Sequence, residues 1–371
     1  MVSHHDSLGM ARLVPGSVEA KARSLAPVRA WLWSIAGLIL TMVVVGGATR
    51  LTQSGLSITE WKPVIGIIPP LTAEAWQSAF DKYKAIPQYA QLFPDMDLAG
   101  FKAIFYWEWA HRLLGRIIGF AFAAPLLVFW LQARLTPALK PRLLVLLALG
   151  GLQGLIGWWM VKSGLSERVS VSQYRLAVHL VTASVAFSYA IWLAEGLRAT
   201  RDRRIAEAQK LRATSTLIVA CIFGQLGLGA LVAGLHAGLI YNTWPLIDGH
   251  LVPPLADLLS QHPAWTNLFE NVLTVQFDHR MMAYAILIVA LLHAVDARRS
   301  APRSPAARRA SLLAGVVVAQ AALGITTLLL VVPLWAALLH QAMAIIVLGT
   351  AMVHRRRLSP PERYSPLAAS A

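Results

Sequence analysis

Eight apolar runs approach the length of about 20 residues that a helix needs to cross a bilayer. They cover approximately residues 30–49, 107–131, 143–161, 174–193, 216–235, 274–295, 311–332 and 334–353. Hydrophobic residues make up 57% of the 371 residues and charged residues only 14%, which excludes an ordinary soluble enzyme. We therefore predict an all-α integral membrane protein with eight transmembrane helices.

Positive charge is distributed unevenly between the two sets of loops. The segment before the first run and the segments after runs 2, 4, 6 and 8 contain 22 of the 33 Lys and Arg residues. Because positively charged loops stay in the cytoplasm, this bias predicts that both termini are cytoplasmic. It also accounts for the net charge of +15 without a nucleic-acid partner.

The runs divide into two sets of four, which predicts two parallel four-helix bundles related by an axis along the membrane normal. The expected organisation is a cytoplasmic leader (1–29), an N-terminal half (30–195), a cytoplasmic linker (196–213), a C-terminal half (214–355) and a cytoplasmic tail (356–371). The leader resembles neither a cleaved signal peptide nor a transit peptide, which favours a bacterial inner membrane. The long outer loops, 50–106 and 236–273, are expected to be ordered caps.

Four histidines recur in two matched frames. Glu108-Trp-Ala-His111-Arg matches Gln276-Phe-Asp-His279-Arg, and Ala177-Val-His179 matches Leu338-Leu-His340. The topology puts each of them about one turn inside an even-numbered helix, at one depth near the outer, periplasmic face. The remaining histidines have no repeat partner and are expected in loops or packing positions, with His354 near solvent.

Imidazole at membrane depth is costly unless it has a partner, so this repeated pattern favours metal ligation over helix packing alone. Zinc prefers four ligands in one cluster. Two pairs on neighbouring helices suit haem, in which one imidazole binds on each side of the iron. Haem ligated in this way transfers electrons well, so the pattern alone would suggest a cytochrome b.

The two halves differ at one position beside the histidines. Glu108 precedes His111 by three residues, on the same helix face, whereas the counterpart Gln276 has no charge. We interpret Glu108 as the catalytic candidate; the alternative is a salt bridge to Arg112 or Arg116. Arg112, Arg116 and Arg280 are candidates to pair with haem propionates or to extend toward the membrane surface.

A second repeated frame, Gln-x-x-x-Gly, lies in runs 3, 5 and 7. It comprises Gln153–Gly157, Gln225–Gly229 and Gln320–Gly324. Small residues of this kind favour close helix packing, which is the preferred interpretation. The alternative is a flat surface against which a planar ring can lie.

With these residues in view, the chain resembles the haem A synthase family, in its proteobacterial and mitochondrial form, over nearly all of residues 30–355. The resemblance rests on Gly46-Gly-Ala-Thr-Arg-Leu-Thr-Gln-Ser-Gly-Leu-Ser57, Trp61-Lys-Pro63, Phe105-Tyr-Trp-Glu-Trp-Ala-His-Arg-Leu-Leu-Gly-Arg116, Gly151-Leu-Gln-Gly-Leu-Ile-Gly-Trp-Trp-Met-Val161 and Tyr241-Asn-Thr-Trp-Pro245. With Cys221 as its single cysteine, the chain lacks the loop cysteine pair of the Bacillus-type members.

The resemblance implies oxidation of the C8 methyl group of haem O to the formyl group of haem A, by two successive hydroxylations and loss of water. It implies that His279 and His340 ligate a resident haem b. His111 and His179 would hold the substrate haem, with Glu108 as the acid–base or charge-stabilising group.

Two other functions remain open from the residues. One is a di-haem b-type cytochrome that exchanges electrons with quinol, and the other is a haem carrier that serves a terminal oxidase. Haem O synthase and oxidase assembly factors are candidate partners, beside membrane lipid. The electron partner, the oligomeric state and the source of the formyl oxygen stay open, and lateral entry of haem O near residues 107–131 is a hypothesis.

Overall fold

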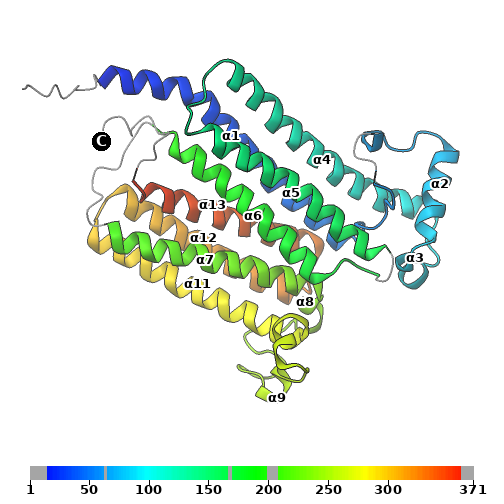
Figure 1. Ribbon diagram of the computed structural model, residues 1–371. Coiled ribbons are helices and arrows are strands. Elements are labelled where there is room, and N and C mark those ends of the chain that lie inside the picture. Colours follow the sequence, from blue (N-terminus) through cyan, green and yellow to red (C-terminus); the bar gives the residue numbers. More distant parts are fainter. Residues whose placement is uncertain (1–14, 62–64, 166–168, 199–207, 361–371) are drawn as a thin grey trace, which may run out of the picture.

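The computed structural model describes residues 15–61, 65–165, 169–198 and 208–360 (Figure 1). The first part of the predicted leader, half of the linker, the end of the tail, and Lys62 and Pro63 of the Trp-Lys-Pro motif lie outside the described residues. Helices account for most of the described chain, which contains no β-strand.

Eight helices among the described residues are long and apolar enough to span a membrane, which confirms the predicted fold class. They are α1 (Pro15–Leu51), α4 (Leu98–Leu131), α5 (Lys140–Gly164), α6 (Gln173–Gly196), α7 (Ala208–Gly234), α11 (Val272–Ser300), α12 (Pro305–Leu329) and α13 (Leu334–Arg357). The short helices are η1 (Ile65–Ile67), α2 (Ala73–Lys84), α3 (Pro87–Leu92), α8 (Ala237–Ile240), α9 (Leu255–Leu258), η2 (Ala264–Thr266) and α10 (Asn267–Glu270).

Several helix boundaries differ from the predicted apolar runs. α1 begins at Pro15 and α7 at Ala208, so parts of the segments interpreted as leader and linker are helical. α12 ends at Leu329 rather than at 332, because Pro333 caps the start of α13 and the preceding residues form the turn. These helices are longer or shorter than their runs because caps and turns, rather than hydropathy, end a helix.

The difference that matters for the histidines concerns α4, which begins nine residues before its predicted run. The Asp97 side chain caps the helix by accepting a hydrogen bond from the Gly100 amide at 2.8 Å. His111 therefore lies 13 residues after the helix start, well beyond the single turn that we predicted. The added turns project past the apolar run and pack Phe101 and Phe105 against α2.

Four helices form the centre of the bundle. α6 packs against α1, α5, α7 and α13, and α13 packs against α1, α6, α7 and α12. α4 and α5 lie on one side of this centre, and α11 and α12 lie on the other (Figure 1). One buried core, including Leu32, Ile191 and Leu348, runs through the central helices.

The two flanking pairs are not packed equally. Only 11% of the most apolar stretch of α4 and 6% of that of α5 are buried, against 33% for α11 and 22% for α12. α4 and α5 also contact each other less extensively than α11 and α12 do. The N-terminal helices are therefore the more loosely packed pair.

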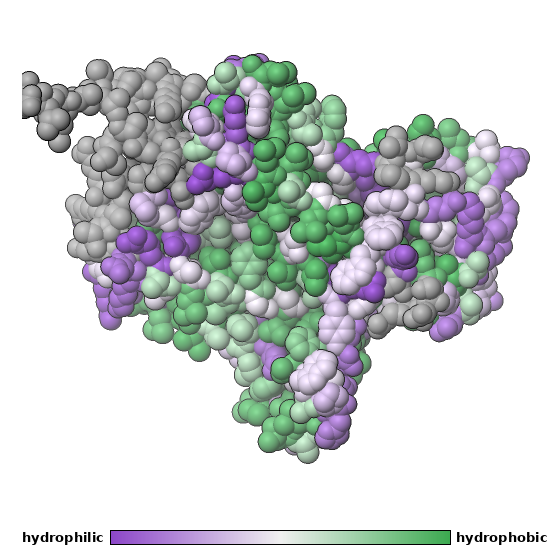
Figure 2. All heavy atoms as spheres, viewed as in Figure 1, coloured by the Kyte–Doolittle hydropathy of each residue, from purple (hydrophilic) through white to green (hydrophobic). Residues whose placement is uncertain are grey.

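Two ordered caps lie together at one end of the bundle, which we call the long-loop end. It carries α2 and α3 from the first long loop and α8, α9 and α10 from the second (Figure 1). Trp76, Phe80 and Tyr83 of α2 are buried against α4, and Ile247, Leu258 and Leu273 form a second small core. Figure 2 shows hydrophobic side chains over the middle of the visible face and hydrophilic ones gathered on α2.

The opposite end of the bundle contains buried polar contacts. Glu195 of α6 accepts a hydrogen bond from Arg357 of α13 and pairs with Arg29 of α1 at 3.7 Å, which ties three helices together. His354, expected near solvent, is instead fully buried. Its Nε2 lies 2.8 Å from Nε2 of His293 of α11, so the two rings satisfy each other inside the bundle.

Candidate functional site

Each of the four repeated histidines packs against a glycine of a neighbouring odd-numbered span. A Cβ atom built on the glycine would lie 3.1 Å from the ring at Gly46 and His111, 3.4 Å at Gly157 and His179, 3.3 Å at Gly229 and His279, and 2.7 Å at Gly324 and His340. The glycines thus give each imidazole room against a helix backbone. Gly46, in α1, extends to the first span the frame that the sequence revealed only in runs 3, 5 and 7.

Each half contributes two of these histidines. His111 of α4 lies near His179 of α6, and His279 of α11 lies near His340 of α13. All four rings are partly accessible rather than sealed in the core. This grouping within each half agrees with the pairs that the family resemblance implies.

Three glutamine amides contact three of these histidines. The Gln225 amide nitrogen donates to the backbone carbonyl of His279 at 3.0 Å and lies 3.2 Å from its Nδ1. Gln320 makes the same contacts with His340, at 3.1 and 3.2 Å. In the amide orientation that satisfies its hydrogen bonds, Gln153 lies 3.0 Å from Nδ1 of His179.

Sequence reasoning identified these glutamines only as part of a packing frame and missed their contact with the histidines. The available signal was the four-residue spacing to the glycine, which puts both residues on one helix face. The facing helix could not be read from that spacing. The sequence left two interpretations of the glycines, close helix packing and a flat surface for a planar ring. In the structure each of these glycines packs against a ring, and that ring is the imidazole of the histidine.

Glu108 is 2% exposed and accepts four hydrogen bonds. Its Oε2 accepts from the Ser57 hydroxyl and from the Ile58 amide, both at 2.8 Å. Its Oε1 accepts from Nε and Nη2 of Arg112, at 3.0 and 2.6 Å. The salt bridge to Arg112, weighed as the alternative to a catalytic role, is therefore present, and it fastens the first long loop to α4.

The C-terminal half builds a neutral version of this contact. Gln276 donates to the Tyr241 carbonyl at 3.2 Å, and Arg280 donates to the same carbonyl at 3.1 Å and to that of Leu246 at 3.3 Å. In both halves, the arginine directly after the histidine holds a long loop in place: Arg112 follows His111, and Arg280 follows His279. The N-terminal half adds a carboxylate to this contact where the C-terminal half has an amide.

The three candidate propionate partners lie in different surroundings. Arg112 also donates to the carbonyls of Glu60 and Ile58, so four of its five N–H groups are engaged. Arg280 is buried, and its Nε has no hydrogen-bond partner among the described residues. Arg116 lies one turn after Arg112 on α4 and is partly buried. Arg280 therefore has a buried N–H donor available for an anionic group.

A tyrosine of the α2 cap, Tyr83, lies within the influence of the Glu108 charge. Tyr83 is fully buried, and its hydroxyl donates to Gln88 at 3.1 Å. Burial raises the pKa of the Tyr83 hydroxyl, and the negative charge of Glu108 raises it further. The cap over the N-terminal site thus holds this phenol protonated.

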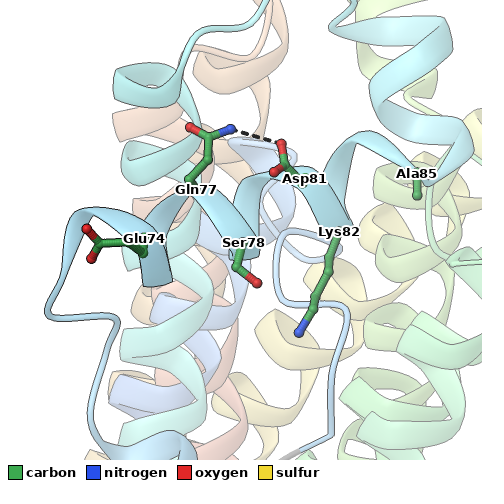
Figure 3. A pocket seen from close by; sticks show the side chains of 6 residues that line it. All are labelled: Glu74, Gln77, Ser78, Asp81, Lys82 and Ala85. Atoms are coloured by element: carbon green, nitrogen blue, oxygen red, sulfur yellow. Dashed lines mark hydrogen bonds between the residues drawn. The ribbon is translucent and has the colours of Figure 1, made fainter.

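An open pocket on α2 is a separate feature. Figure 3 shows the side chains that line it, which are Glu74, Gln77, Ser78, Asp81, Lys82 and Ala85. Gln77 donates to Asp81 across one helical turn at 2.9 Å. None of the four repeated histidines lines this pocket, so it does not belong to their sites.

The donor set of each half is of the kind that haem takes. Within the described residues, no three or more His, Cys, Asp or Glu side chains group together as a site for a bare metal ion. Paired imidazoles on facing helices supply the two axial ligands that haem iron takes. The amide oxygens of Gln225 and Gln320 are buried without a partner in the described chain, so each glutamine keeps an acceptor for a further polar group.

Comparison with known proteins agrees with this geometry. The family model described as cytochrome oxidase assembly protein matches residues 29–352. The chain is 58% identical to "Heme A synthase" of Beijerinckia indica over 91% of this chain and 94% of the relative. It is 55% identical to "Heme A synthase" of Brucella suis over 89% and 91%. The chain therefore belongs to the cytochrome oxidase assembly protein family that includes these haem A synthases.

Proposed function

We propose that the protein converts haem O to haem A in the membrane, by oxidising the C8 methyl group to a formyl group. Two successive hydroxylations give an alcohol and then a gem-diol, which loses water to leave the formyl oxygen. The name shared by relatives that are 54–58% identical supports haem A synthesis. The observation that supports chemistry in one half is the charge difference between Glu108 and Gln276, which occupy matching positions in the two halves.

The two halves divide the work. His279 and His340 bind a resident haem b, whose iron supplies reversible electron transfer. His111 and His179 bind the substrate haem, and Arg280 pairs with a propionate in the C-terminal site. Arg112 and Arg116 are the corresponding arginines in the N-terminal site.

Glu108 acts beside the substrate as a fixed negative charge. Its four hydrogen bonds hold the carboxylate in one orientation, three residues before His111. A preorganised charge of this kind stabilises developing positive charge without reorganising during the reaction. Glu108 and Arg112 together fasten the loop from Ser57 to Glu60 beside the same region.

The proposed arrangement in the membrane follows the charge bias of the loops. Both termini are cytoplasmic, the two four-helix halves are parallel repeats, and the long-loop end with its haem sites faces the periplasm of a bacterial inner membrane. Haem O synthase and oxidase assembly factors are candidate partners for delivery and release of haem.

Mass analysis of extracted haems tests the proposal. Expression in cells that supply haem O should yield protein that contains haem b together with haem A or its alcohol precursor. Haem b and haem O without either oxidised product would contradict it and would favour a di-haem b-type cytochrome, which the similar construction of the two sites also allows. Growth with heavy dioxygen or in heavy water would then identify the source of the formyl oxygen.

A further inference from the structure

The span that faces His111 lacks the glutamine found at the other three histidines. In α1 the frame is Met42-x-x-x-Gly46, where α7 has Gln225-x-x-x-Gly229. Gly46 contacts the His111 ring as Gly229 contacts that of His279. The glycine of the frame is therefore kept, while the amide is replaced by a thioether.

Met42 does not substitute for the missing amide. A thioether has no hydrogen to donate and is only a weak acceptor. The methyl end of Met42 packs against α4 at Gly115, where an added Cβ would lie 3.2 Å from it, one turn beyond His111. Among the described residues, no side chain forms a hydrogen bond with the His111 ring.

The three amides hold their histidines in a way that matters for ligation. Gln225 and Gln320 each contact both the ring Nδ1 and the backbone carbonyl of one histidine, which restrains the imidazole relative to its helix. Such outer partners fix the orientation and the basicity of a ligand, and their loss typically weakens metal binding by about 10- to 100-fold. His111 lacks this restraint.

The helix that carries His111 is also the less firmly held. Only 11% of the apolar stretch of α4 is buried, against 33% for α11, which carries the equivalent His279. Displacing the ring or the helix at His111 therefore breaks fewer packing contacts than the same movement at His279 would.

We propose that Met42 makes His111 the exchangeable ligand of the N-terminal haem site, whereas glutamines keep His179, His279 and His340 bound. This inference rests on the proposed function, because it requires a haem between His111 and His179. It means that one coordination position opens toward α4, which permits either a reaction at the iron or release of the product haem.

Carbon monoxide provides the test, since it binds ferrous haem only where an axial ligand leaves. The full-length protein with His279→Ala and His340→Ala, loaded with haem O and reduced, is titrated with carbon monoxide by absorbance. Adding Met42→Gln should lower the carbon monoxide affinity by at least about tenfold. Met42→Leu also lacks an amide, so it should leave the carbon monoxide affinity within about twofold of the parent.

The reciprocal change guards against a misfolded variant. In protein with His111→Ala and His179→Ala, Gln225→Met should raise the carbon monoxide affinity of the C-terminal haem by about tenfold. Unchanged affinity in both Met42→Gln and Gln225→Met would overturn the inference while leaving the proposed function intact. Failure of the parent protein to bind haem O through His111 and His179 would overturn both.

Discussion

Arg112 donates two hydrogen bonds to a single oxygen of Glu108, from Nε at 3.0 Å and from Nη2 at 2.6 Å. The second carboxylate oxygen remains for the loop residues Ser57 and Ile58. The C-terminal half has arginine and glutamine in the same positions, and there both side chains bond to one backbone carbonyl. The ion pair is therefore one of two chemical differences between the sites; the other is Met42 in α1, where α7 has Gln225.

Replacing Glu108 with Gln should abolish the conversion of haem O while the C-terminal haem keeps its spectrum. The change removes the charge and leaves the largely buried guanidinium of Arg112 without its partner, at a cost of about 1–3 kcal/mol in the free energy of unfolding. Extracted haems measured by mass, with the reduced-minus-oxidised spectrum, check both parts. Gln276→Glu is the matched control and should retain conversion.

Arg112→Gln separates the carboxylate from the ion pair. It loosens the same loop but keeps the carboxylate, so partial conversion is expected where Glu108→Gln gives none. Equal loss in both variants, or loss of all haem from either one, would assign Glu108 a structural role.

Removing the histidines of one half of the molecule should affect only the haem that this half binds. His279→Ala or His340→Ala should eliminate haem b, because a haem that needs two imidazoles loses one axial ligand. His111→Ala or His179→Ala should leave haem b in place and prevent oxidation of haem O. Quantifying haem b and haem O separately in the purified variants tests this; loss of haem b from His111→Ala would contradict the division.

Two glycine substitutions should differ in effect because the space beside the histidines differs. A Cβ at position 324 would lie 2.7 Å from His340, whereas one at position 157 would lie at an ordinary 3.4 Å from His179. Gly324→Ala should displace the ring, lower haem b occupancy and cost about 1–3 kcal/mol by overpacking. Gly157→Ala should be mild, as measured by haem content and thermal unfolding; the opposite order would argue that the rings bind iron from other positions than those they occupy here.

Tyr83 should make the folded protein sensitive to high pH. Its pKa is raised in the folded state by burial and by the charge of Glu108, so its contribution to stability is complete below about pH 10, the unfolded value, and is lost as the pH rises further. Between pH 8 and pH 11 the stability of the detergent-solubilised protein, measured by thermal unfolding, should decline less steeply for Tyr83→Phe than for wild type. The difference in slope should correspond to on the order of one proton. An identical slope in both proteins would show that this phenol does not titrate as inferred.

Much of the molecule could be predicted from local properties of the chain. Eight spans follow from runs of apolar residues, since a bilayer requires helices of a certain length. The four histidines and their common depth follow from the repeat and from counting spans, whereas the pairing of His111 with His179 and of His279 with His340 was implied by the resemblance to haem A synthases. The distinction between Glu108 and Gln276 was equally visible, because it is a difference at one aligned position.

Other features depended on which helix faces which. The contacts of Gln153, Gln225 and Gln320 with three histidines join residues on different helices, and periodicity within one helix cannot identify the partner. The early start of α4 depends on the Asp97 cap and on packing against α2, neither of which hydropathy measures.

The sequence by itself determined the membrane fold, the four repeated histidines and the charge difference between Glu108 and Gln276, because each is a property of composition, spacing or repetition. Only the tertiary structure decided that Glu108 is locked in an ion pair beneath a loop, and that Met42 leaves His111 without the amide partner of the other three. Those facts depend on distances between helices, which are set by side-chain packing across the whole bundle.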